Sequence, residues 1–388
     1  MSYLSIEGAT IINGTGKTPL QDGCILVEDA RIVQAGPRGS FDLPPERQTI
    51  DAAGRYITPG LIDAHNHLCI YAGDEAKQMS APDGTLMLRA ARHARADLAS
   101  GVTTTRTVGE KNLLDIQYRD GIAEGLIAGP RVLASAWPIC CTGGHGWHLG
   151  REVDGEAEVR QAVRDNCKAG ADLIKIMVSG GVSTKGSAPI ICYFSQSEIE
   201  ALIDEAHRLG KKVAGHIYGG LGADWALAAG IDTVEHGAYL SDEQLDIMAS
   251  KGTWLVATQG VYLITEDTQE RPPWHERKAR DAEESCKRVF RQAMQKGIRI
   301  TFGADAHHEP FRMARELELA VDLGMPEMDT IVNATAGAAE ACGIERDVGT
   351  LTSGKLADLL ILGSDPLKDI RALKDIVTIV QGGKVVEF

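Results

Sequence analysis

His65 and His67 are the first residues along the chain whose spacing predicts a chemical function. The preceding stretch, residues 56–62, is short, apolar and rich in strand-forming types, and Pro59-Gly60 would interrupt a helix, so we expect a β-strand. On a strand, side chains two positions apart share one face, whereas on a helix they diverge by about 200°. Two imidazoles on one face can bind a divalent metal ion. The pair alone is also consistent with surface or core histidines, so further ligands are needed.

Further residues of metal-binding type stand in or at the ends of four later predicted strands. They are Lys175, His216, His236 and Asp305. Seven strand–helix steps of about 30–35 residues each account for the distance along the chain from His65 to Asp305. The candidate ligands therefore fall in register with the predicted repeat.

Lys175 lies inside the apolar run 173–177, so we expect its side chain to be buried. A buried ammonium group without a partner costs several kcal/mol, and burial therefore favours the neutral, nucleophilic amine. Such an amine can be carboxylated by CO2, and the two oxygens of the carbamate can bridge two divalent ions about 3.5 Å apart. The alternative is a core lysine that reaches a carboxylate.

The elements that would position these residues are eight short β-branched runs, each followed by a charged, alanine-rich stretch of helical character. After the run that ends at His65, they are 102–106, 131–134, 173–178, 212–216, 233–236, 253–256 and 299–302. Eight successive strand–helix units predict parallel strands in a closed (β/α)8 TIM barrel of class α/β. An open, doubly wound sheet is the structural alternative. The longest irregular segments follow predicted strands, where a barrel carries its active site.

Both ends of the chain have a different pattern, in which short strands are separated by turn signals such as Asn13-Gly14 and Asp22-Gly23. We expect one small composite β-domain, a β-sandwich, from residues 1–56 and 347–388. Residues 57–346 would then form the barrel.

The composition limits the partners and the location. The 388 residues carry a net charge of −14, which argues against nucleic acid or an anionic membrane as a partner. The chain has no apolar run of about 18 residues and no signal-peptide pattern at its start, so we expect a cytoplasmic protein. Its eight cysteines include no Cys-x-x-Cys motif, and we expect free thiols. A homo-oligomer remains open.

Segments 63–67, 174–176, 215–216, 235–237 and 303–306 together resemble the amidohydrolase superfamily, in the branch of imidazolonepropionase-like and prolidase-like metal-dependent dipeptidases. The resemblance also includes 58–63 and 349–359, which in that superfamily adjoin a composite β-domain. It implies two divalent metal ions, most often zinc. The implied ligands are His65, His67 and Asp305 on the buried ion, His216 and His236 on the exposed ion, and carboxylated Lys175 with a hydroxide bridging both.

The resemblance also implies a mechanism. The bridging hydroxide would attack an acyl carbon, Asp305 would take its proton and pass it to the departing nitrogen, and the exposed ion would polarise the carbonyl. Two ions bring a charge of about +4, and the carbamate, Asp305 and hydroxide bring about −3. A site with a net charge of about +1 would stabilise the oxyanion of a tetrahedral intermediate.

Three further residues are candidates for contact with the substrate. His145, in segment 142–146, resembles a dipeptidase motif in which a histidine helps to polarise the carbonyl, although it could be a loop histidine without a role. If the strand continues beyond His216, the Tyr218 side chain would lie on the same face as that histidine. Its hydroxyl could then bind a substrate carboxylate or the oxyanion. The alternative is a tyrosine that only packs at the rim of the site. Lys185 lies where such dipeptidases tend to carry a Ser-Pro type sequence, and it either contacts an anionic group or is solvated.

Several functions agree with these residues. The first is hydrolysis of an amide bond in dipeptides or N-acyl amino acids, and the alternatives are hydrolysis of a cyclic amide or imidazolone, a carbamate, a urea or an ester. Deamination fits less well, because deaminase-type relatives carry a glutamate shortly after the fifth-strand histidine and 217–220 contain no acid. A catalytically silent binding protein would be expected to have lost ligands. The roles of His307 and His308, close to Asp305, are open.

Overall fold

The computed structural model describes residues 2–71, 73–263, 271–305 and 311–387. They group into two compact units. The first consists of Met1–Asp63, Ala96–Thr104 and Glu309–Phe388, and the second of Ala64–Arg95 and Thr105–His308.

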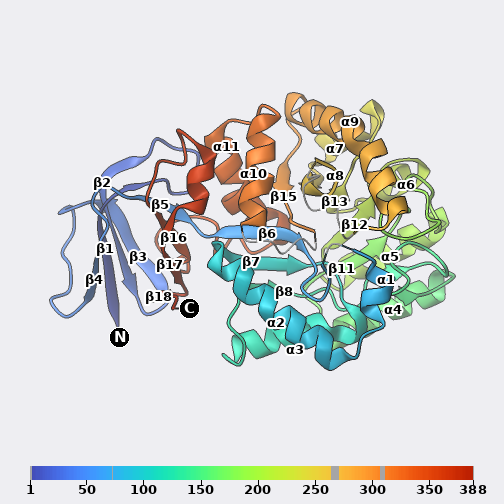
Figure 1. The fold of residues 1–388 in the computed structure, drawn as a ribbon, viewed down its shortest axis with the longest axis horizontal. Coiled ribbons are helices and arrows are strands. Elements are labelled where there is room, and N and C mark those ends of the chain that lie inside the picture. The colour runs from blue at the N-terminus through green and yellow to red at the C-terminus, as the bar shows by residue number, and fades with distance from the viewer. Residues whose placement is uncertain (1, 72, 264–270, 306–310, 388) are drawn as a thin grey trace. The chain divides into compact units, whose positions relative to one another are not determined.

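The first unit contains a mixed sheet to which both ends of the chain contribute (Figure 1). Its order is β18-β17-β16-β5-β1-β2-β3, and β4 pairs with β1. The strands are β1 (Tyr3–Ile11), β2 (Leu20–Glu28), β3 (Arg31–Pro37), β4 (Gln48–Asp51), β5 (Tyr56–Pro59), β16 (Leu359–Leu362), β17 (Ile376–Gln381) and β18 (Lys384–Val385). Antiparallel pairing of β16 with β5 joins the C-terminal strands to the N-terminal ones. Helices α10 (Arg312–Asp322), α11 (Glu327–Val332) and α12 (Ala338–Cys342) also belong to this unit.

Most of the second unit is built from strands that alternate with helices. A seven-stranded sheet has the order β10-β9-β11-β12-β13-β14-β15, and all its pairings are parallel. Its strands are β9 (Ile139–Cys140), β10 (Arg151–Glu152), β11 (Ile174–Met177), β12 (Val213–Ile217), β13 (Thr233–His236), β14 (Trp254–Ala257) and β15 (Ile300–Phe302). A separate three-stranded sheet contains β6 (Leu61–Asn66), β7 (Val102–Thr107) and β8 (Arg131–Leu133) in that order.

The helices follow these strands as the sequence predicted. They are α1 (Glu75–Met79), α2 (Asp83–Ala99), α3 (Leu114–Ala123), α4 (Glu156–Ala169), α5 (Gln196–Arg208), α6 (Leu221–Ala229), α7 (Asp242–Lys251), α8 (Gly260–Leu263) and α9 (Pro273–Gln295). Ser195 and Ser241 begin α5 and α7 with capping boxes, which satisfy backbone N–H groups at the start of each helix. The strand–helix alternation is confirmed.

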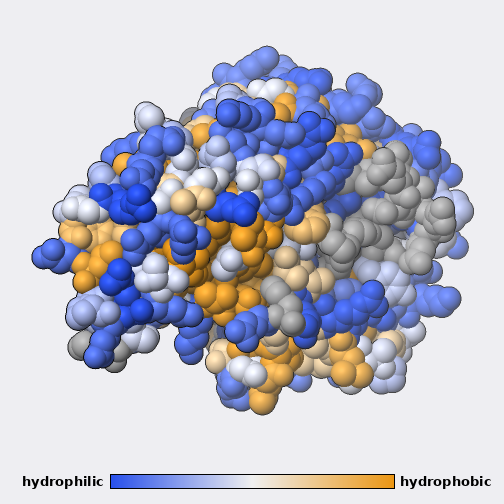
Figure 2. Space-filling view, turned by 60° about the vertical axis from the view of Figure 1, so that its left-hand side comes forward, coloured by the Kyte–Doolittle hydropathy of each residue, from blue (hydrophilic) through white to orange (hydrophobic). Residues whose placement is uncertain are grey.

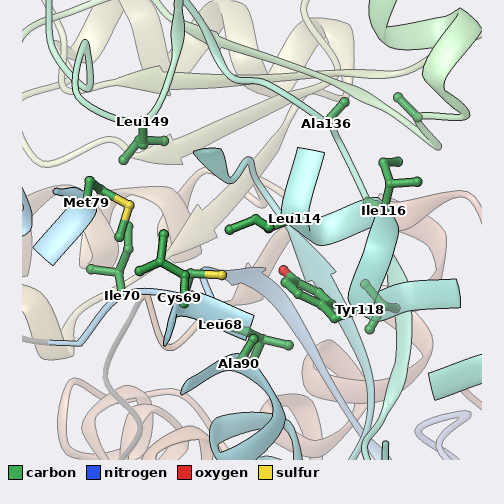
Figure 3. Packing of buried hydrophobic residues seen from close by; sticks show 14 of the residues in the cluster. Leu68, Cys69, Ile70, Met79, Ala90, Leu114, Ile116, Tyr118, Ala136 and Leu149 are labelled. Atoms are coloured by element: carbon green, nitrogen blue, oxygen red, sulfur yellow. The ribbon is translucent and has the colours of Figure 1, made fainter. Parts of the chain in front are cut away.

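The segment that directly follows His67 belongs to a buried hydrophobic cluster (Figure 3). Leu68, Cys69 and Ile70 of this segment pack in one buried cluster with residues that include Met79 of α1 and Tyr118 of α3. Burial of such side chains stabilises the fold by about 1.5–3 kcal/mol each. The cluster therefore holds the chain in place immediately after the two histidines.

The surface face shown in Figure 2 is mostly hydrophilic, with hydrophobic residues gathered near the centre of the view. Among the described residues, no helix combines the length and apolar character that crossing a membrane requires.

Glu205 of α5 is the centre of a charged cluster that joins α5 to α4. Its side chain is 1% exposed and accepts hydrogen bonds from Arg160 (3.2 Å) and Arg164 (2.7 Å) of α4 and from Arg208. The hydrogen bond from Arg164 is the largest influence that lowers the pKa of Glu205 to about 2, from an ordinary 4.5. The ionised carboxylate is therefore favoured in the folded protein.

Glu205→Gln is expected to lower the free energy of unfolding by about 1–2 kcal/mol at pH 7, because half-exposed arginines lose a buried partner. A carboxyl group with a lowered pKa stabilises the fold above pH 4.5, and this contribution is lost as the pH falls towards 2. The difference between wild type and variant should therefore shrink below pH 4.5. Urea unfolding at several pH values measures it, with Glu200→Gln on the exposed face of α5 as the control. A pH-independent difference would contradict this account.

Candidate metal centre

The six predicted ligands line one cavity in the second unit. His65 lies in β6 and His67 directly follows it, Lys175 lies in β11, His216 in β12, His236 ends β13, and Asp305 follows β15. In the parallel sheet β9–β15, the carboxyl ends of the strands meet at one edge. This common edge explains why Lys175, His216, His236 and Asp305 come together, and the hydrogen bond from Asp305 N to His65 O brings the end of β6 beside them.

Asp305 is the residue around which the histidines gather. Its Oδ1 lies 3.4 Å from His65 Nε2 and 3.9 Å from His67 Nε2, and its Oδ2 lies 3.7 Å from His236 Nδ1. On the other side of His236, Nε2 lies 2.8 Å from His216 Nδ1. Ligand atoms of His65, His236 and Asp305 all lie within 4.8 Å of one another. Imidazole nitrogens and a carboxylate at this spacing fit a divalent metal ion.

The backbone at this point is unusually close-packed. Asp305 N–H donates to His65 O at 2.9 Å, and a Cβ at Gly303 would lie 2.3 Å from His65 Cβ. Asp305 and His236 have φ angles of 50° and 71°, in the left-handed region that residues other than glycine rarely adopt. Such conformations are concentrated at functional sites.

Lys175 is completely buried, as predicted. Its Nζ has no hydrogen-bond partner within the part of the chain that the structure describes. Burial lowers the pKa of Lys175 to about 8, although the charges of Glu235 and Asp305 act in the opposite direction. A minor fraction of the amine is therefore neutral at pH 7, and Lys175 lines the same cavity as the other candidate ligands.

The electrostatics favour an ionised Asp305 and neutral His67, His216 and His236, whereas Asp305 and Glu235 raise the pKa of His65 against the effect of its burial. Burial by itself would raise the pKa of Asp305, but His65, His236 and His67 hold it well below its usual range. Burial lowers the pKa of His67 to about 4. Neutral imidazoles and an ionised carboxylate are the protonation states that metal ligands require.

Glu235 and Arg106 support the ligands, and the sequence did not reveal this role. Glu235 Oε2 accepts a hydrogen bond from His65 Nδ1 at 2.6 Å, which leaves His65 Nε2 facing Asp305. Arg106 Nη2 donates to Glu235 Oε1 at 2.8 Å, and Arg106 Nε donates to Ala64 O. Such outer partners fix the orientation of a metal-binding histidine. The only sequence signal was that Glu235 adjoins His236.

His145 and Tyr218 also line the cavity. The His145 ring centroid lies 4.2 Å from that of His216, and burial lowers the pKa of His145 to about 3. A Cβ at Gly181 would lie 2.4 Å from the His145 ring, so glycine is needed there. The buried Tyr218 ring lies 5.1 Å from His216. Their roles in catalysis remain predictions.

Lys185 does not lie beside His145 and Tyr218 in the cavity. It is exposed, its Nζ lies 5.4 Å from the centroid of the Trp274 ring, and it is not among the described residues that line the cavity. His307 and His308 lie outside the described residues. Glu75 of α1 and His275 of α9 also line the cavity, and the sequence predicted neither of them, because no predicted strand ends at either residue.

Several known proteins are similar to this chain over most of its length. The model of the amidohydrolase family matches residues 56–386. The ochratoxinase of Aspergillus niger is 28% identical over 98% of this chain and 86% of its own length. The imidazolonepropionase of Mesorhizobium japonicum is 26% identical over 91% of this chain and 89% of its own. The crystal structure of a Xaa-Pro dipeptidase with bound methionine superimposes with a TM-score of 0.92 at 31% identity, covering all of both chains.

The fold is therefore of the TIM-barrel type. The chain belongs to the amidohydrolase family, as its sequence motifs predicted. It is a hydrolase that acts on the C–N bond of an amide.

Glu235→Gln is expected to weaken zinc binding by about 10- to 100-fold, because His65 loses the carboxylate that orients its ring. Zinc affinity is measured by competition with a chromophoric chelator, and circular dichroism checks that the variant is folded. Glu243→Gln, an exposed substitution on α7, is the control. Unchanged zinc affinity in folded Glu235→Gln would remove Glu235 from this role.

Proposed function

We propose that the protein is a binuclear metal-dependent amidohydrolase that cleaves dipeptides or N-acyl amino acids. The observation that carries this proposal is the unpartnered, fully buried amine of Lys175 beside the histidines and Asp305. The other five candidate ligands alone could hold one or two ions. An unmodified amine buried among them, without a hydrogen-bond partner among the described residues, would serve no structural purpose.

The proposed ligand sets follow from the positions of the side chains. His65, His67 and Asp305 would hold one ion, and His216 and His236 would hold the second. Carboxylated Lys175 would bind both. When bound, two divalent ions, most often zinc in this branch, would activate water and polarise an acyl carbonyl.

Carboxylation of Lys175 is consistent with its environment. The neutral amine attacks CO2, a bond forms between Nζ and carbon, and the nitrogen releases one proton to solvent. Because burial lowers the pKa of Lys175 to about 8, the required neutral form is accessible at physiological pH. The product replaces a partly charged amine with an anion, which suits a site meant for cations.

Asp305 is the proposed proton carrier. Its carboxylate remains partly exposed towards the cavity and is held ionised by the histidines around it. It would accept a proton from the attacking water and deliver it to the nitrogen of the departing amine. His145 and Tyr218 would donate hydrogen bonds to the oxygen of the acyl group, where negative charge develops.

The similarity to a Xaa-Pro dipeptidase with bound methionine supports an amino-acid-containing substrate. The similarity to imidazolonepropionase supports the second candidate, hydrolysis of a cyclic amide.

We also propose that the two sheets around the site are parts of one closed (β/α)8 barrel. Two backbone hydrogen bonds near their edges support closure, from Asp172 N to Ala134 O at 2.7 Å and from Asp305 N to His65 O at 2.9 Å. Residues 1–56 and 347–388 would form the composite β-domain, a β-sandwich, and 57–346 the barrel.

Lys175→Ala is expected to lose most bound metal and at least about 100-fold in turnover, since the bridging ligand is missing. Short carboxylic acids should partly restore activity by occupying the place of the carbamate. Metal content by mass spectrometry and turnover with and without propionate measure both effects. Full activity without an added acid would refute the bridge. Lys168→Ala, on α4 and away from the cavity, is the control.

A substrate screen tests the proposed reaction. Zinc-loaded protein is incubated with dipeptides, N-acyl amino acids, cyclic amides and carbamates, and release of amine is measured. Cleavage of the first two classes is expected, with Asp305→Asn losing most of the turnover because it cannot carry the proton. Cleavage of cyclic amides alone would favour the second candidate. Near-normal turnover by Asp305→Asn would reassign the proton carrier.

A further inference from the structure

Glu75 places a negative charge in the wall of the metal-site cavity, on the short helix α1. Its Oε2 accepts hydrogen bonds from Ser183 Oγ at 2.9 Å and from His148 Nε2 at 3.1 Å. Its Oε1 has no hydrogen-bond partner among the residues that the structure describes. Two side chains from two other loops thus fix the carboxylate and leave one oxygen available.

His275 provides a second, independent observation. The residue is 5% exposed and lines the same cavity, and neither of its ring nitrogens has a partner in the described part of the chain. Buried polar groups are nearly always hydrogen-bonded, so an imidazole whose nitrogens have no partner among the described residues can bind a further group at the cavity, such as a water molecule or part of a substrate. Burial lowers the pKa of His275 to about 4, although the nearby charge of Glu75 raises it. The ring is therefore neutral at pH 7, and one nitrogen can accept a hydrogen bond.

Glu75 is ionised at the same pH. Burial alone would raise its pKa, but the hydrogen bond from His148 and the neighbouring histidines lower it to about 2. The cavity also has apolar walls, which include Leu149, Val182 and Val261. In such surroundings a hydrogen bond between opposite charges is stronger than in water.

We propose that Glu75 and His275 form a subsite for a positively charged nitrogen of the substrate, an ammonium or guanidinium group. This group would donate one hydrogen bond to Glu75 Oε1 and another to a ring nitrogen of His275. The inference rests on the proposed function and narrows its substrate class, because an N-acyl amino acid with an apolar side chain has no cationic group and would leave both partners unsatisfied. The charge can come from the amino terminus of a dipeptide or from a basic side chain.

Three closely matched substrates distinguish the two sources. Alanyl-norleucine carries an ammonium at its amino terminus, propanoyl-lysine carries one on its side chain, and propanoyl-norleucine carries neither. The wild type is expected to cleave one of the charged substrates with a kcat/KM at least 30-fold above that of propanoyl-norleucine. The preferred substrate identifies the source of the charge. Equal kcat/KM values for all three would overturn the proposal and leave amide hydrolysis intact.

Glu75→Gln removes the charge but keeps an oxygen that can accept from His148 and Ser183. We expect it to lower kcat/KM for the preferred charged substrate by at least 10-fold and for propanoyl-norleucine by less than 3-fold. Asp74→Asn is the matched control, since Asn can still cap α1 and Asp74 does not line this cavity; it should leave the preference unchanged. An equal loss on all substrates would show that Glu75 is only structural and would overturn the subsite.

Calorimetric binding to the zinc-loaded Asp305→Asn variant separates this proposal from the proposed reaction. Tighter binding of a charged ligand than of propanoyl-norleucine, abolished by adding Glu75→Gln, would support the subsite even if the wild type cleaves none of the three. Equal binding of all three ligands would overturn it, whatever the reaction proves to be.

Discussion

The burial of the Lys175 amine among histidines is the constraint on which the rest of the site depends. Burying a cation without a partner is costly, and four imidazoles cannot compensate for it with negative charge. The carboxylates of Glu235 and Asp305 reduce the cost, because their charges favour the protonated amine. Carboxylation and metal binding would remove the remaining cost, so stability and catalysis would depend on the same chemistry.

The parallel strands provide the rigid positions that this chemistry requires. Because β11, β12 and β13 are paired in register, His216 lies opposite both Met177 and Glu235, and one residue of slip would move the ligands to another face. Behind them, Arg106 and Glu235 fix the ring of His65. The segments that follow the strands contribute further cavity residues, such as Glu75 of α1, His145 and His275 of α9. Strands would thus position the reaction, and the proposed subsite on α1 and α9 would select what is cleaved.

The sequence predicted the residues that follow the strand–helix repeat and missed the residues that do not follow it. The candidate ligands could be found because a strand alternates its faces and the strand–helix repeat places each strand end at one edge. Glu75 and His275 could not be found, since no predicted strand ends at either residue and their place beside the cavity depends on long-range packing, such as the contacts of Glu75 with His148 and Ser183. The same limitation explains why the position of Lys185 could not be predicted. Its charge suited a contact with the substrate, but the side chain lies on the surface over Trp274.

The most direct test of the binuclear site is a crystal structure of the zinc-loaded protein with anomalous diffraction data collected on both sides of the zinc edge. The account predicts two anomalous peaks, one beside His65, His67 and Asp305 and one beside His216 and His236. Electron density should extend from Lys175 Nζ as a carboxylate between them. A single peak, or an unmodified lysine beside two ions, would contradict the bridging role of Lys175 on which the account rests.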